Sequence, residues 1–157
     1  MFSKASLIAA IVAAIAIAPQ LVAGAPASGA VHAGAAKLQA PVIRESFTPL
    51  PCTGKPNDRS TLQQEGCAEQ QILRTEARIN TLASSVFGRL PDRAAKVRFI
   101  TAQRAWLTYR RADCLSLSDV FEGGSQAPVL DSQCAADRNQ QRIKDLRTFL
   151  TDLGGTG

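Results

Sequence analysis

The segment AQRAWLTYRRADC, residues 102–114, carries the pattern that decides the fold. Trp106, Arg110 and Cys114 are spaced by four residues, so they stack along one side of an α-helix, with Gln103 one turn before Trp106. An indole with a guanidinium one turn further on favours stacking or cation–π packing. We interpret the pair as a core tryptophan beside an arginine that hydrogen-bonds a neighbouring helix or turn. Contact with a partner is the alternative.

This segment lies inside a predicted helix from about Asp92 to Ser116. The apolar stripe of that helix recurs at intervals of three and four, as an amphipathic helix requires. It comprises Val97, Ile100, Gln103, Trp106, Leu107, Arg110 and Cys114.

A helix is also predicted on each side of it. The earlier one begins at Ser60, which has capping-box spacing to Gln63, and Gly88 is its natural stop. The later one opens with Pro128 at its first position and ends at Gly154. The apolar face of the earlier helix consists of Ile72, Ile79, Leu82 and Val86. The apolar face of the later helix consists of Val129, Ile143, Leu146, Phe149 and Leu150. Three helices with short connections predict an all-α, antiparallel three-helix bundle.

The N-terminus has the layout of a secretory signal peptide. Lys4 is followed by the uncharged apolar run 5–18 and by small residues suited to cleavage. The run is shorter than the roughly 20 residues of a membrane span, although an uncleaved anchor is the alternative. Ala25 follows the LVAG of residues 21–24, so no thiol is available there for lipid attachment. We therefore expect a periplasmic or secreted protein with no lipid anchor and no membrane insertion after cleavage.

The chain divides into three expected parts: a signal peptide over 1–27, a flexible linker over 28–51 and one helical domain over 52–152. The small, uncharged residues 23–36 cannot bury enough surface to offset the entropy of ordering. Between them and the domain, Val42, Ile43, Phe47 and Leu50 are apolar residues that can pad the domain edge in extended form.

Composition excludes several classes of function. The net charge of +5 is too small and too scattered for a nucleic-acid binder. The lone histidine, His32, argues against histidine-dependent nucleophiles and His-ligated zinc. Glu65, Glu69 and Glu76 suit an exposed helix better than an acid–base pair. We therefore expect no catalytic residues, no metal and no cofactor.

Four cysteines in an exported chain predict two disulfides. All four can lie at one end of the bundle, so geometry alone does not choose the pairing. We favour Cys52–Cys67 with Cys114–Cys134, because each pair closes a short loop. The rival pairing is Cys67–Cys114 with Cys52–Cys134.

The segment 102–114 resembles the LprI-like lysozyme-inhibitor family of secreted bacterial proteins. Family features stand at Gln103, Trp106, Tyr109, Arg110 and Cys114, at the turn Gly123-Gly124-Ser125, and at Cys134 followed eight residues later by Arg142. Upstream matches are Ser60, Cys67-Ala68, Glu76 and Ile79-Asn80. The chain departs from the family pattern at three positions. Asn139 stands where the family often has threonine, Arg138 stands where an apolar residue is expected, and Ala83 stands where an aromatic residue is common.

The resemblance implies an all-helical, disulfide-linked envelope domain that binds and inhibits lysozyme. An arginine that enters the lysozyme cleft would neutralise its two catalytic carboxylates. The exposed loop 118–127 and Arg111 are the places to look for such a surface. The alternative is a non-catalytic module that binds another envelope protein or an anionic cell-wall polymer. The oligomeric state stays open.

Overall fold

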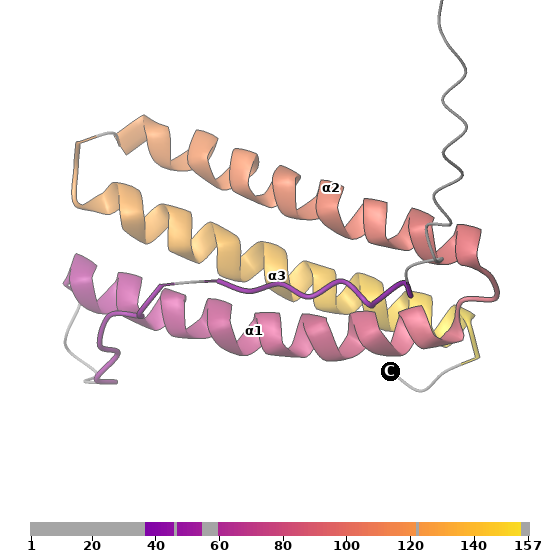
Figure 1. Ribbon diagram of the computed structural model, residues 1–157. Helices are drawn as coiled ribbons and strands as arrows, with labels where there is room; N and C mark the ends of the chain where they lie inside the picture. The colour runs from indigo at the N-terminus through magenta and orange to yellow at the C-terminus, as the bar shows by residue number, and fades with distance from the viewer. Residues whose placement is uncertain (1–36, 46, 55–59, 122, 155–157) are drawn as a thin grey trace, which may run out of the picture. The chain divides into compact units, whose positions relative to one another are not determined.

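The computed structural model describes residues 37–45, 47–54, 60–121 and 123–154, and these residues contain three α-helices and no strand. The helices are α1 (Thr61–Arg89), α2 (Arg93–Ser118) and α3 (Gln126–Asp152), with a short 3-10 helix, η1 (Asp119–Phe121), after α2. They run up, down and up, and α3 packs against both α1 and α2 (Figure 1). The predicted all-α bundle is therefore confirmed. The expected signal peptide, residues 1–27, lies outside the described residues.

The predicted cap at Ser60 is confirmed, and Asp92 caps the start of α2 in the same way. The Ser60 hydroxyl accepts a hydrogen bond from the Gln63 amide at 3.2 Å, and Asp92 accepts one from the Ala95 amide at 2.7 Å. The Gln63 side chain is used differently from the expected capping box, because its Oε1 accepts bonds from the backbone amide and hydroxyl of Thr53.

Three predicted helix boundaries need correction. The first helix continues through Gly88 to Arg89, because glycine is tolerated in the last turn of a helix that tertiary packing supports. The second extends two residues beyond Ser116. Pro128 is the third residue of α3 and not the first, which costs no hydrogen bond because the amides of the first turn have no intrahelical partner.

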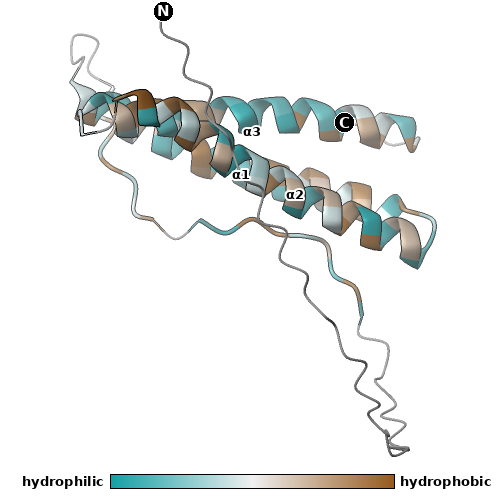
Figure 2. Cartoon of the chain, turned by 90° about the horizontal axis from the view of Figure 1, so that it is seen from above, coloured by the Kyte–Doolittle hydropathy of each residue, from teal (hydrophilic) through white to brown (hydrophobic). Residues whose placement is uncertain are grey.

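The apolar core runs between the three helices, and each helix carries both hydrophilic and hydrophobic residues along its length (Figure 2). Two sequence expectations fail at its edge: Val97 is 44% exposed and Phe149 is 38% exposed. Phe99 is buried instead and meets the Phe149 ring edge-on at 6.0 Å between centroids. One continuous cluster of buried residues within this core consists of Ile79, Leu82, Ala83, Val86, Leu90, Phe99, Ile143, Leu146 and Leu150.

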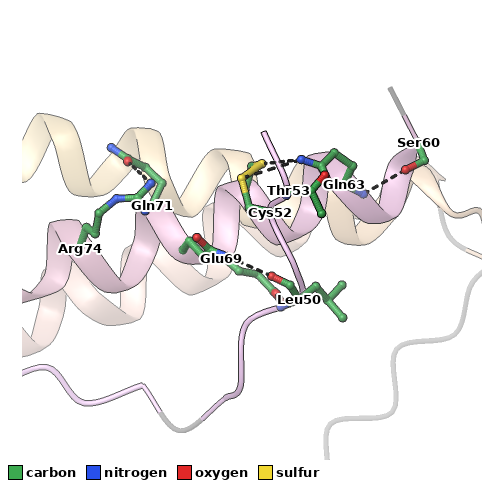
Figure 3. Close-up of a disulfide and its surroundings, with 10 residues drawn as sticks. Leu50, Cys52, Thr53, Ser60, Gln63, Glu69, Gln71 and Arg74 are labelled. Atoms are coloured by element: carbon green, nitrogen blue, oxygen red, sulfur yellow. Dashed lines mark hydrogen bonds between the residues drawn. A yellow bond between two sulfur atoms is a disulfide. The ribbon is translucent and has the colours of Figure 1, made fainter. Parts of the chain in front are cut away.

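The favoured disulfide pairing is confirmed. Cys52 bonds to Cys67 with their Cα atoms 4.7 Å apart, and Cys114 bonds to Cys134 with theirs 5.5 Å apart. Figure 3 shows the first bridge beside Gln63, whose Nε2 donates to the Cys67 sulfur at 3.2 Å. Each bridge closes a loop of the length for which about 3 kcal/mol of stabilisation is typical.

Residues 37–45 and 47–54 form an extended segment, here called the strap, that runs in the direction opposite to α1 (Figure 1) and lies against α1 and α2. The Ile43 amide donates to the Asn80 side chain at 2.8 Å, and the Ile43 carbonyl accepts from it at 2.9 Å. The Glu69 carboxylate accepts from the Leu50 amide at 2.6 Å. Residues 37–45 and 47–51 of the expected linker are therefore packed against the helices. The rest of that linker, residues 28–36 and 46, lies outside the described residues.

Candidate functional site

Arg110 is the centre of a buried polar network, here called the Arg110 network, that joins the strap to all three helices. One guanidinium nitrogen donates to Glu76 of α1 and to Asn139 of α3, each at 2.7 Å. The other donates to Glu45 of the strap. The arginine is only 3% exposed, so its charge needs these partners.

Asn139 extends the network toward α1. It is fully buried, and its amide nitrogen donates to the Thr75 hydroxyl at 3.0 Å. Its oxygen accepts from Arg110, so one side chain bridges two helices. An amide side chain supplies both the donor and the acceptor used here.

Trp106 lies between two arginines. The guanidinium carbons of Arg110 and Arg142 each lie 5.6 Å from the centroid of its ring. Arg142 Nε also donates to the Gln103 side-chain oxygen at 3.3 Å. The structure thus brings together four of the predicted motif residues: Gln103, Trp106, Arg110 and Arg142. Stacking of this kind also holds the long arginine side chains in one geometry.

The other motif residues lie elsewhere. Tyr109 is 53% exposed on α2. Gly123, Gly124 and Ser125 form the turn into α3, where Gly123 has a positive φ of 78° and the Gly124 amide donates to the Phe121 carbonyl at 2.9 Å. A positive φ explains the glycine at position 123. These residues shape the turn and do not extend the Arg110 network.

Burial changes the acidity of several groups near the network. Desolvation raises the pKa of Glu76 to about 6, against the opposing effect of Arg110. Desolvation also raises the pKa of Asp131 and lowers that of Arg142. A pocket of about 330 Å³ borders this region and is lined by Arg110, Arg111 and Asp131 among others.

The polar groups of this region mainly hold the fold together. Glu45 pairs with Arg110, and Glu69 accepts from the strap backbone. Among the described residues, Asp113, Cys114 and Cys134 form the one group with metal-ligand spacing, but both sulfur atoms belong to a disulfide. A disulfide sulfur lacks the thiolate charge that binds zinc.

Among the described residues, the exposed large apolar side chains include a group at the end of α2. Four of them, here called the α2 tip, lie in the last turn of α2 and in η1: Leu115, Leu117, Val120 and Phe121. Val120 is 75% exposed. Arg111 lies one turn before Leu115, so a cation stands on the same side of the helix as part of the tip. Phenylalanine and arginine, the residue types of Phe121 and Arg111, are enriched at the cores of protein interfaces.

The family model described as "Lysozyme inhibitor LprI" matches residues 52–146, which include both disulfides, α1 and α2 and most of α3. The chain belongs to the LprI family. This LprI protein is thus a member of an inhibitor family and not of an enzyme family. No curated protein and no solved structure matches the chain.

One part of the Arg110 network lies outside the range that the family model matches. The strap residues before Cys52, including Glu45, precede the matched range, although Glu45 completes the Arg110 network. The sequence motif indicated Arg110 but not Glu45, because the two residues are 65 positions apart and no local pattern connects them.

In the described part of the chain, no helix is both long and apolar enough to span a bilayer.

Proposed function

We propose that this chain is an exported protein that inhibits lysozyme by placing the α2 tip against the substrate cleft. Membership of the LprI family supports the choice of target. Two disulfides in a small domain suit an oxidising compartment outside the cytosol.

The observation that carries the choice of surface is the burial of the motif residues. Gln103 and Arg110 are buried and bonded within the bundle, so they are not free to bind a second protein. The α2 tip, by contrast, exposes Val120 and Phe121 together. Arg111, one turn before Leu115, is an exposed cation of α2 that would meet the catalytic carboxylates of a glycosidase cleft.

Charge supports an apolar contact as the main source of affinity. The chain carries a net charge of +5, and animal-type lysozymes are usually cationic, so long-range electrostatic steering would be repulsive. An apolar anchor does not suffer this repulsion once the surfaces touch. Added salt should therefore weaken inhibition only to the extent that Arg111 contributes to the binding of lysozyme.

The test is an assay of peptidoglycan lysis by a panel of lysozymes, with the chain produced by export into an oxidising compartment. We expect stoichiometric inhibition of at least one lysozyme. A Val120→Ser, Phe121→Ser double variant should inhibit at least tenfold less, which corresponds to about 1.4 kcal/mol of binding. The matched control is Val97→Ser, because Val97 is also an exposed valine of α2 but lies near the other end of the helix.

Two results would contradict the proposal. Absence of inhibition across the panel, by protein with both disulfides formed, would remove lysozyme as the target. Full inhibition by the double variant would move the contact away from the α2 tip.

A further inference from the structure

A second surface feature is a groove between the strap and the helices, here called the strap groove. It has a volume of about 540 Å³ and is lined by strap residues 37–44 together with residues of α1 and α2. That volume falls within the roughly 300–1,000 Å³ of small-molecule sites. Ile100 and Leu107 of α2, with Pro41 of the strap, give it apolar walls.

The charged residues of the strap groove are all cations. Lys37 and Arg44 come from the strap, and Arg93 and Arg104 come from α2, whereas no Asp or Glu lines the groove. No ion pair joins Lys37, Arg44 or Arg104 to a carboxylate of the described residues. Lys37, Arg44 and Arg104 around one groove attract an anion, and no described acidic residue among those that line the groove opposes this attraction.

The groove also contains a buried donor without an acceptor. Gln103 lines it, and the side-chain oxygen of this residue accepts from Arg142. Nε2 of the same amide is buried and has no hydrogen-bond partner among the described residues. Buried amide donors are almost always paired, so an unpaired donor on a residue that lines a basic groove supports an acceptor supplied by a ligand.

We propose that the strap groove binds a small amphiphilic anion, with carboxylate or phosphate oxygens toward the cations and the Gln103 amide and an apolar body against Ile100 and Leu107. Arginine suits such oxygens because its planar fork donates two parallel hydrogen bonds. The groove offers no aromatic residue for base stacking, which argues against single-stranded nucleic acid. This site is independent of the α2 tip and of lysozyme inhibition.

The experiment is isothermal titration of the full, oxidised chain with four probes that have straight alkyl chains of nearly equal length, and with inorganic phosphate. Octanoate and octyl phosphate should each bind once per chain, and the tighter of the two identifies the preferred acidic group. Octanol and octyltrimethylammonium should bind at least tenfold more weakly, because they lack the negative charge. Inorganic phosphate should also bind more weakly than octyl phosphate, because it lacks the apolar body.

Substitutions locate the site. Arg104→Gln should weaken binding of the better anion at least fivefold. Arg98→Gln is the matched control, because Arg98 is an exposed arginine of α2 that does not line the groove. Gln103→Glu should weaken binding as well, because it replaces the amide donor by a carboxylate oxygen of similar shape. Circular dichroism of each variant checks that the helices are intact.

Three results would overturn the inference. The first is absence of saturable binding by both anions. The second is equal binding of octanol and octanoate, which would reduce the groove to an apolar surface. The third is equal affinity of the Arg104→Gln and Arg98→Gln proteins, which would place the anion elsewhere.

Discussion

At the scale of the residue, Arg110 shows how a sequence motif can mark a structural position. Its position on a helix was predictable from the four-residue spacing to Trp106 and Cys114. Its partners were not, because Glu76 and Asn139 lie 34 and 29 residues away in the chain. Only the packing of three helices brings these groups within hydrogen-bond distance.

The pH dependence of stability should report on Glu76. Burial raises the pKa of Glu76 to about 6 from 4.5, so the folded state retains a proton that the unfolded chain releases above pH 4.5. The stabilisation from this group is complete below pH 4.5 and is lost as the pH rises through about 6. Glu76→Gln keeps an acceptor for Arg110 but cannot titrate, so it should remove this part of the pH dependence.

Urea denaturation across this pH range measures the effect as the difference in unfolding free energy between the wild type and the variant. Asp152→Asn is the control, because Asp152 is an exposed carboxylate at the end of α3. Parallel pH profiles of the wild type and the Glu76→Gln protein would contradict the prediction.

At the scale of the element, the contact between the strap and α1 depends on a missing side chain. A Cβ atom at Gly66 would lie 2.6 Å from the Pro51 carbonyl oxygen and 2.8 Å from that of Leu50. The strap can therefore approach α1 this closely only at a glycine. In the sequence, Gly66 is only a poor helix former inside a predicted helix, so its role in the contact with the strap could not be predicted.

Two glycine substitutions in α1 should have opposite effects. Gly66→Ala should lower the free energy of unfolding by about 1–3 kcal/mol, because the strap backbone must move away. Gly88→Ala should raise it by about 0.5–1 kcal/mol, because alanine is the better helix former. The structure places nothing within 4 Å of a Cβ atom at Gly88, so the second change is free of clashes. Thermal denaturation measures both, and equal effects would show that the strap does not rest on Gly66.

At the scale of the whole molecule, the two disulfides act on different parts of the domain. Cys52–Cys67 ties the end of the strap to α1, whereas Cys114–Cys134 ties α2 to α3 across the turn. The end of the strap, the start of α1, the end of α2 and the start of α3 all lie at the same end of the bundle (Figure 1). The Arg110 network joins the strap to α2 at a second place, through the ion pair between Glu45 and Arg110.

Removal of each disulfide should separate these roles. Changing Cys52 and Cys67 to serine, or Cys114 and Cys134 to serine, should cost about 3 kcal/mol in either case. Hydrogen exchange should distinguish the two proteins, because the Leu50 amide, which is bonded to Glu69, should lose more protection in the first. Equal protection of that amide in both proteins would mean that the strap is held without its disulfide.

Local interactions along the chain were sufficient to predict the three helices, the cap at Ser60, the start of the second helix near Asp92, the disulfide pairing and the family. Each of these depends on residues a few positions apart or on a short loop, and such spacings are visible in a sequence. Packing alone decided the course of the strap, the burial of Arg110 and Asn139, the exposure of Val97 and the cationic lining of the strap groove. These features join residues tens of positions apart, and their energies arise only when the helices have excluded water between them.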